Sequence, residues 1–221
     1  MVSKVHFYSL MAEQAAKQIT GSFQQWTSFL STASRLYKYP YPDQLMIHIQ
    51  RPDATACAEY ELWSDTMGRY VKRGAKGIAL LDCRGEQPRL RYVFDVSDTG
   101  ARENSRPVIL WEMREEYRRP VQDALERAFG ASGEKSLESQ LEEAASRLAE
   151  DYWQNYGRQF LHILADSYLE EYDEDNLSVV FQRAVAASAA YQACARCTEE
   201  ADEYFVQTDF LDVLDFNTRQ T

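Results

Sequence analysis

The spacing of apolar residues changes near residue 100, and this change constrains the fold more than any other feature. Before it, GIALLDC (77–83) and RLRYVFDVS (89–97) read as strands, and RGEQP (84–88) between them suits a hairpin loop. From residue 108 onward, apolar residues recur at the three- and four-residue steps of helices. We therefore expect an α+β fold, with a small antiparallel sheet and helices in residues 1–100 and an acidic all-α domain in 101–221. The boundary is soft, because one core can span both parts.

Helices are expected on both sides of the strand pair. Residues 12–38 have an amphipathic pattern, although Gly21 allows a later start with Thr20 or Ser22 as N-cap. QLMIHIQ (44–50) fits either a strand or one buried helical turn, and the pattern leaves both open. AEYELWSDTMGRY (58–70) predicts a short helix that stops at Gly68. Residues 100–107 are expected to form a loop.

The C-terminal half predicts helices separated by short turns. Two segments, 108–118 and 120–130, are expected to divide at Pro120. Ser136 is the expected N-cap of a long helix whose apolar stripe runs from Leu137 to Tyr156. Further helices are expected at 158–171, 177–197 and 200–213.

Charge is distributed unevenly along the chain. The formal net charge is −11, yet residues 1–133 carry 18 Lys and Arg against 16 Asp and Glu, a net +2. Residues 134–221 carry 6 against 19, a net −13. A uniformly acidic protein repels DNA, whereas a protein with segregated charge can present a locally positive face.

The sequence contains none of the motifs that identify common enzyme sites. It has no H-E-x-x-H, no G-x-S-x-G and no phosphate-binding glycine loop. Cys194 and Cys197 have the spacing of zinc ligands, but they lie mid-helix without a second pair, so buried thiols are expected. We expect no enzymatic activity, no metal and no cofactor. The four scattered cysteines and the absence of a signal peptide or apolar span of membrane length predict a cytoplasmic protein.

The stretch GRYVKRGAKGIALLD (68–82) concentrates positive charge on a glycine-rich turn that leads into a strand. Glycines permit positive φ and close backbone approach, and exposed backbone N–H groups suit an anion. Tyr70 and Tyr92 offer rings for stacking, and a cationic groove with aromatic rings is the pattern of sequence-tolerant single-strand binding. In the second strand, Arg89 and Arg91 alternate with apolar residues and are expected on the opposite, polar face. The candidate DNA-binding residues are Arg69, Tyr70, Lys72, Arg73, Gly74, Lys76, Gly77, Arg89 and Arg91. A solvated helix-to-strand connection is the structural alternative for this turn.

These residues also carry a family resemblance. An apolar segment ending in Gln50, a helix with Trp63, a G-x-x-V-x-x-G-x-K-G turn (68–77) and F-D-V-S-D-T (94–99) follow one another. Over residues 24–99 the chain resembles the N-terminal domain of the antirestriction protein ArdC and, more closely, LtrC-like proteins of conjugative elements in Firmicutes. The resemblance implies binding of single-stranded DNA, a bacterial host and a role in protecting mobile DNA from host defence. The zinc-peptidase domain of ArdC has no counterpart here, and the chain is either a stand-alone version or a fragment of a longer protein.

Two other functions fit the acidic half. Its carboxylates can imitate DNA phosphates, so the chain would inhibit a host defence nuclease of the restriction or CRISPR type. The residues expected to bind that partner are Glu170, Glu171, Asp173, Glu174 and Asp175. Alternatively, the stripe from Leu137 to Tyr156 would serve oligomerisation. The sequence leaves open which defence system is opposed, whether the bound DNA is single- or double-stranded, and the oligomeric state.

Overall fold

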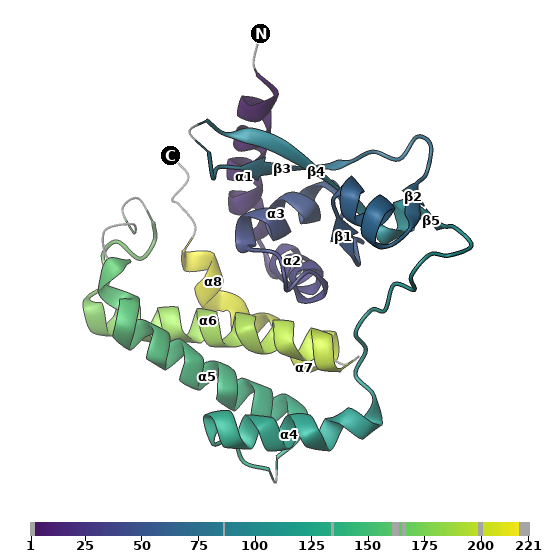
Figure 1. Ribbon diagram of the computed structural model, residues 1–221. Coiled ribbons are helices and arrows are strands. Elements are labelled where there is room, and N and C mark those ends of the chain that lie inside the picture. The colour runs from purple at the N-terminus through teal and green to yellow at the C-terminus, as the bar shows by residue number, and fades with distance from the viewer. Residues whose placement is uncertain are drawn as a thin grey trace. The chain divides into compact units, whose positions relative to one another are not determined.

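The α+β fold class is confirmed by a computed structural model of the 221-residue chain, which describes residues 3–85, 87–133, 135–160, 164, 167–198 and 201–216 (Figure 1). Three N-terminal helices precede small antiparallel sheets around residues 57–101, and the C-terminal half is helical. The helices are α1 (Lys4–Ile19), α2 (Phe23–Arg35), α3 (Tyr41–Gln50), α4 (Glu115–Phe129), α5 (Leu137–Tyr156), α6 (Glu174–Cys197), α7 (Ala201–Tyr204) and α8 (Leu211–Asp215). The strands are β1 (Cys57–Ala58), β2 (Arg69–Val71), β3 (Ile78–Asp82), β4 (Arg89–Asp95) and β5 (Thr99–Ala101).

The chain divides into two compact units. The first comprises residues 1–19 and 31–111, and the second comprises residues 20–30 and 112–221, so that α2 contributes to both. In the sequence of the first unit, 14 Lys and Arg stand against 11 Asp and Glu, a net +3. The second has 10 against 24, a net −14. Charge is therefore segregated between the units as well as along the sequence.

The core of the first unit lies between its three-stranded sheet and α3. The strand order is β1-β4-β3, with Ile78 opposite Val93 and Leu80 opposite Arg91. Opposed residues share a face, and on this face Ile78, Leu80 and Val93 are buried with Met46 and Ile47 of α3. The Gln50 side chain closes the outer edge of β3, because its amide both donates to Ala79 O and accepts from Ala79 N at 2.9 Å. An otherwise open strand edge is thereby satisfied.

A separate two-stranded ribbon is formed by β2 and β5, which lie side by side although 27 residues separate them in the chain (Figure 1). The expected loop at 100–107 is therefore wrong in its first residues, which belong to β5. The expected helix over 58–70 is also too long, since the helical residues are only 60–66, of which Leu62–Thr66 form a short π-helical segment, η1. The expected stop at Gly68 is confirmed, because this residue takes a positive φ of 65° and β2 begins directly after it. Three-residue strands are too short to show an alternating pattern.

The helix expected over residues 12–38 is interrupted at Gly21, the residue that made this prediction weaker. The region expected as one helix over 12–38 is two helices, α1 and α2, and α1 begins earlier, at Lys4. Ser22 rather than Thr20 caps α2, since its hydroxyl accepts the Gln25 N–H at 3.3 Å. The segment left open between strand and helix is α3, with proline in its first turn.

The second unit is built around α5 and α6, which pack along each other. Ser136 caps α5 as expected and accepts the Ser139 N–H at 3.2 Å. Buried alanines of both helices line the contact, namely Ala144, Ala145, Ala149, Ala184 and Ala190. Aromatic rings fill the remaining space, for example Tyr191 against Phe205 and Phe210. The predicted stripe is only partly buried, because Leu148, Tyr152 and Tyr156 are about half exposed.

Three of the helical regions expected in the C-terminal half differ from the prediction. Residues 108–114 are not helical, and α4 runs continuously through Pro120 in its second turn, where proline removes a single backbone hydrogen bond. The expected helix over 158–171 is a 3-10 turn, η3 (Gly157–Gln159), followed at 168–171 by turns; residues 161–163 and 165–166 lie outside the described residues. The expected helix over 200–213 is divided into α7, a 3-10 turn η5 (Gln207–Phe210) and α8.

Candidate nucleic-acid interface

The basic turn, residues 72–77, connects β2 to β3 through a tight backbone reversal. Ala75 N donates to Lys72 O at 3.1 Å, and Gly74 in the third position has a φ of 88°. This arrangement matches a type II turn, which needs positive φ at that position and therefore favours glycine. No heavy atom lies within 4 Å of where a Gly74 side chain would start, so a ligand can approach the backbone there.

The second glycine of the turn has a different purpose. A Cβ on Gly77 would lie 3.2 Å from both Tyr92 Cβ and Phe94 Cζ. Gly77 therefore lets the chain enter β3 while packed against the neighbouring strand, and it does not take a positive φ. The turn is consequently held beside Tyr92, whose side chain is 43% exposed.

Four cations lie on β2 and the basic turn, and none forms an ion pair with a residue that the structure describes. Lys72 Nζ donates to Ser97 O at 2.8 Å, and Arg69 Nε donates to the Thr99 hydroxyl at 2.7 Å. Both acceptors are neutral, so they orient the side chains without cancelling their charge. Arg73 and Lys76 are exposed. The turn therefore presents uncompensated positive charge to solvent.

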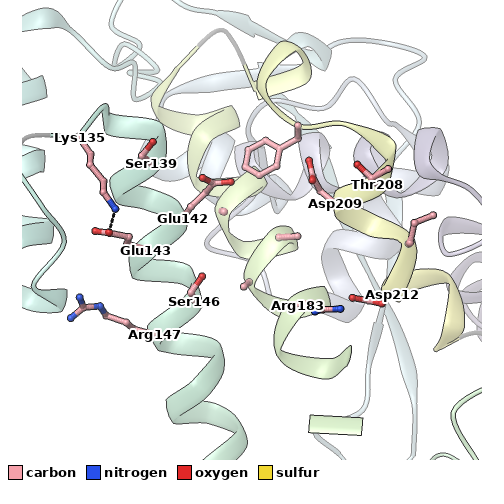
Figure 2. A pocket seen from close by; sticks show the side chains of 15 residues that line it. Lys135, Ser139, Glu142, Glu143, Ser146, Arg147, Arg183, Thr208, Asp209 and Asp212 are labelled. Carbon is pink, nitrogen blue, oxygen red and sulfur yellow. Dashed lines mark hydrogen bonds and ion pairs between the residues drawn. The ribbon is translucent and has the colours of Figure 1, made fainter. Parts of the chain in front are cut away.

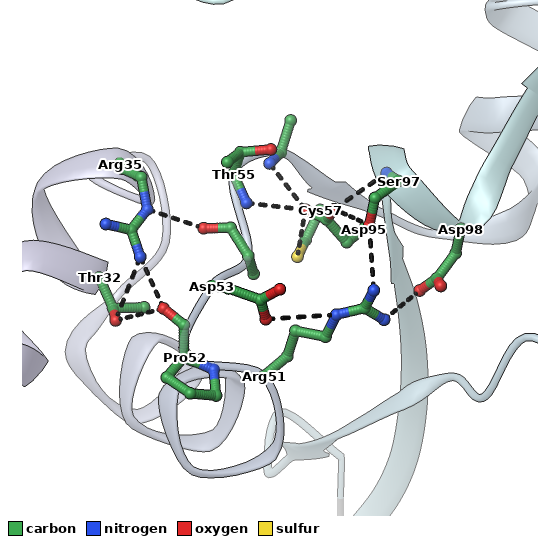
Figure 3. Close-up of polar contacts among 12 residues, drawn as sticks. Thr32, Arg35, Arg51, Pro52, Asp53, Thr55, Cys57, Asp95, Ser97 and Asp98 are labelled. Atoms are coloured by element: carbon green, nitrogen blue, oxygen red, sulfur yellow. Dashed lines mark hydrogen bonds and ion pairs between the residues drawn. The ribbon is translucent and has the colours of Figure 1, made fainter.

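The F-D-V-S-D-T segment (94–99) anchors this turn through Lys72, and Figure 3 shows the contacts that hold the segment itself. Asp95 is buried, and its carboxylate accepts Thr55 N and Ala56 N at 2.8 and 3.0 Å and Ser97 N and Oγ at 2.9 and 2.6 Å. Burial alone would raise the pKa of Asp95, but the hydrogen bonds from Ser97, Ala56 and Thr55 outweigh it and the pKa is lowered. The charged carboxylate thus ties the loop after α3 to residue 97, whose carbonyl holds Lys72.

Arg51 and Trp63 complete the anchor. Arg51 forms an ion pair with Asp98 at 2.7 Å and donates to Ser97 Oγ at 3.0 Å, and the hydrogen bond to Asp98 raises the pKa of Arg51. The Asp98 carbonyl accepts Lys72 N at 2.8 Å. The buried Trp63 indole donates to Phe94 O at 2.8 Å. Val96 contributes as well, because its N–H donates to Ala56 O at 2.8 Å and its carbonyl accepts the Thr99 hydroxyl at 2.8 Å. Every residue from 94 to 99 thus makes a side-chain or backbone bond that fixes η2 (Val96–Asp98) beneath the turn or joins it to neighbouring segments.

The two arginines of β4 lie in a different environment from the turn cations. Arg91 pairs with the buried Asp43 at 2.5 Å and with Glu59 at 3.3 Å, and Arg89 pairs with Asp82 at 3.1 Å. The expectation that they lie opposite the apolar face is wrong, because the register places them on the same face as Val93 and Leu80. The face carrying Tyr92 is the more exposed one. The structure therefore gives Arg89 and Arg91 carboxylate partners that Arg69, Lys72, Arg73 and Lys76 lack.

Two basic residues next to the ribbon were not identified from the sequence. The Ser105 hydroxyl donates to Gly68 O at 2.8 Å and Arg106 N donates to Met67 O at 2.9 Å, so the loop after β5 lies against the start of β2. Arg102 and Arg106 are exposed on this loop. Their sequence context, R-E-N-S-R, carries no periodic signal, and only the pairing of β2 with β5 brings them to the site.

The acidic residues proposed as a partner-binding surface are all exposed at the start of α6. Asp173 caps this helix, since its carboxylate accepts Asn176 N at 2.8 Å. Glu174 pairs with Arg158 at 3.8 Å, and Glu174 and Asp175 lie in the first turn, where the helix dipole favours negative charge. Glu170 and Glu171 lie in the turns before the helix. Asp173 and Glu174 therefore have structural roles already.

A cavity of about 840 Å³ lies within the second unit among α5, α6 and the η5–α8 segment (Figure 2). Its carboxylates are largely engaged by neighbouring groups. Glu143 pairs with Lys135 and accepts Ser132 N at 3.0 Å, Glu142 accepts the Tyr204 hydroxyl at 2.9 Å, and Asp209 accepts Val206 N at 2.8 Å. The charges of both signs in its lining point to no single ligand class.

Cys194 is buried, and burial raises the pKa of its thiol to about 12. Among the described residues no group of three or more His, Cys, Asp and Glu side chains is arranged to hold a metal ion. None of the described helices is long and apolar enough to cross a bilayer.

Comparison with known proteins gives no relative from which a function could be transferred. No protein-family model, curated protein or solved structure matches the chain.

Proposed function

We propose that the chain binds single-stranded DNA through the basic turn and β2, without catalysing a reaction. The observation that carries the proposal is that Arg69, Lys72, Arg73 and Lys76 have no carboxylate partner among the described residues, whereas the arginines of the adjacent hairpin do. Unpaired cations beside exposed tyrosines suit a ligand that offers both phosphates and bases. On the resemblance to ArdC and LtrC-like proteins, we further propose that this activity acts on mobile DNA in the cytoplasm of a bacterial host, where a bound strand is shielded from defence nucleases.

The direct test is fluorescence anisotropy of a labelled oligonucleotide of about 16 nucleotides, titrated at salt concentrations from about 50 to 200 mM. We expect affinity to fall with salt, and the triple variant Lys72→Glu/Arg73→Glu/Lys76→Glu to bind on the order of 100-fold more weakly. In a second assay, bound oligonucleotide should resist a single-strand-specific nuclease. Unchanged affinity in the triple variant would remove the turn from the interface.

The matched control is Arg114→Glu/Arg118→Glu/Arg119→Glu, which changes the net charge by the same amount on the second unit. These residues lie at and near the N-terminus of α4, in exposed ion pairs with Glu116, Glu115 and Asp123 that contribute little to stability. If both triple variants lose affinity equally, binding depends on net charge alone and not on the turn.

Inhibition of a host defence nuclease through the acidic surface is the alternative, and a separate variant distinguishes it. Glu170→Gln/Glu171→Gln/Asp175→Asn neutralises exposed carboxylates and leaves the Asp173 cap and the Glu174 ion pair in place. A DNA-binding protein should retain its oligonucleotide affinity in this variant. A DNA mimic should lose nuclease inhibition in it and keep that inhibition when the basic turn is reversed.

A further inference from the structure

The β2–β5 ribbon carries uncompensated cations at both of its ends. Lys72 and Arg73 follow the last residue of β2, while Arg102 and Arg106 lie on the loop that is bonded to Met67 and Gly68, just before its first residue. None of these four forms an ion pair with a described residue. A strand rises about 3.3 Å per residue, so the two ends of β2 from Gly68 to Lys72 are about 13 Å apart. The positive charge is therefore spread along the ribbon rather than confined to the turn.

The loop that carries the two arginines is fixed rather than loosely attached. Ser105 Oγ donates to Gly68 O and accepts Arg102 N at 2.5 Å, and Ser105 N donates to Arg102 O at 3.0 Å. One serine thus closes the loop on itself and onto β2. Such a loop presents both guanidinium groups from a defined backbone, which reduces the entropy lost when they bind a ligand.

An exposed aromatic ring lies between the two charged ends. Tyr70 is opposite Gly100, and its side chain is 45% exposed. A Cβ added to Gly100 would lie 2.5 Å from the Tyr70 hydroxyl oxygen and 2.8 Å from Cε1, so the ring covers this glycine. An aromatic residue that packs over a glycine on the facing strand is held against the backbone, with its other face open. Tyr70 therefore offers a fixed surface on which a base can stack.

We infer that the ribbon binds a single nucleic-acid strand across β2 and β5, with a base stacked on Tyr70 and phosphates bound by Arg102 and Arg106 at one end and by the basic turn at the other. The inference rests on the proposed function and adds to it two binding residues, Arg102 and Arg106, and the position of the Tyr70 ring between them and the basic turn. In a duplex, the bases are stacked and paired inside, so a flat ring on a surface ribbon cannot reach a base face. The ligand class is therefore a single-stranded oligonucleotide.

The test compares variants of the full chain with single-stranded DNA, single-stranded RNA and duplex DNA of one sequence. We expect Arg102→Ala/Arg106→Ala to reduce the slope of log affinity against log salt by about 1.4, because each lost phosphate contact contributes about 0.7 on a single strand. The matched control Lys4→Ala/Lys38→Ala removes the same charge from exposed positions of the first unit and should leave the slope unchanged. The RNA arm identifies whether the sugar contributes to recognition.

Tyr70 is tested separately from charge. Tyr70→Ala should weaken single-strand binding by about 5- to 100-fold with an unchanged salt slope, while Tyr70→Phe keeps the ring and should bind almost as well as the unaltered chain. Gly100→Ala displaces the ring without changing charge and should resemble Tyr70→Ala. Circular dichroism of each variant confirms that the fold is retained.

The outcomes separate this inference from the proposed function. If reversal of the basic turn abolishes binding but Arg102→Ala/Arg106→Ala leaves the slope unchanged, the proposed function stands and this inference is overturned. Equal losses for single strands and duplex in Tyr70→Ala would likewise overturn the stacking role. If the unaltered chain binds no oligonucleotide, both fail.

Discussion

The basic turn and the β3–β4 hairpin are two arginine- and lysine-rich regions of the same unit, and they use their charge in opposite ways. In the hairpin, Arg84 and Arg89 pair with Asp82, and Arg91 pairs with Asp43 and Glu59. On β2 and the basic turn, Arg69 and Lys72 are instead oriented by a neutral hydroxyl and a neutral carbonyl group, and Arg73 and Lys76 are exposed. The difference shows that a cluster of basic residues in a sequence does not by itself indicate a binding site for an anion. Its availability to a ligand depends on whether the fold brings a carboxylate to it.

The largest effect is expected where the turn is anchored. Asp95→Ala removes the acceptor for three backbone N–H groups and one hydroxyl, and each buried donor left unpaired costs about 1–3 kcal/mol. We predict a loss of about 4 kcal/mol in the free energy of unfolding, measured by urea denaturation. Asp95→Asn keeps one acceptor oxygen and should lose about half as much. A loss below about 1 kcal/mol in Asp95→Ala would show that the anchor is not needed to hold the turn.

The role of this segment illustrates what the sequence can and cannot reveal. The order Phe94 to Thr99 was recognisable as a motif, and the hairpin that leads into it was predictable from its strand patterns. Two of the residues that donate to Asp95, Thr55 and Ala56, lie about 40 residues earlier. No local pattern connects such positions, because the hydrogen bonds depend on how the loop after α3 passes the end of β4. The strands β2 and β5 were not predicted either, because three residues are too few to show the two-residue alternation of a strand.

The second prediction concerns the hairpin, where an ion pair supports the core. Asp43→Ala leaves the Arg91 guanidinium, only 22% exposed, with the more distant Glu59 as its remaining carboxylate partner. We predict a loss of about 2 kcal/mol in the free energy of unfolding, since breaking one side of a half-buried pair leaves a charge poorly compensated. The double variant Asp43→Leu/Arg91→Met replaces the pair with apolar groups and should recover most of this loss. Failure of that recovery would indicate that Asp43 acts through other contacts.

The sequence predicted that both regions are basic, but it did not show which of them has cations available to a ligand. Arg91 and Asp43 are 48 residues apart, and Arg89 and Asp82 face each other only because of the β3–β4 register. The alternation in RLRYVFDVS was interpreted correctly as a strand, but the buried face was assigned to Tyr92 instead of Val93. Both sets of side chains contain apolar residues, so hydrophobicity alone cannot choose between them. The carboxylates of Asp43 and Glu59 make the partial burial of Arg91 tolerable, whereas Arg89 remains exposed beside Asp82.

A third prediction compares the two regions directly by removing one arginine from each. Arg73→Ala should weaken oligonucleotide binding about threefold to tenfold and lower the salt slope by about 0.7, because it removes an unpaired phosphate contact. Arg89→Ala should change affinity less than about twofold, since its charge is already balanced by Asp82 and exposed ion pairs contribute little to stability. Anisotropy titrations measure both variants under one set of salt conditions. Equal losses would mean that ion pairing does not withdraw the hairpin arginines from the ligand.

The smallest effect is a pH dependence that differs in sign between Asp82 and Asp43, the two buried carboxylates that pair with arginines of the hairpin. Hydrogen bonds from Arg84 and Arg89 lower the pKa of Asp82 to about 2, while burial raises the pKa of Asp43 despite Arg91. A carboxyl group whose pKa is lowered by folding stabilises the fold above its ordinary pKa of about 3.9, and this stabilisation is lost as pH falls toward 2. A carboxyl group whose pKa is raised by folding gains stabilising effect as pH falls from the raised pKa to about 3.9. The stability advantage of the unaltered chain over Asp82→Asn should therefore shrink as pH falls through this range. Its advantage over Asp43→Asn should instead grow as pH falls through the raised pKa to about 3.9. Urea midpoints at a series of pH values measure both differences, and two curves of the same sign would show that burial does not outweigh the ion pair at Asp43.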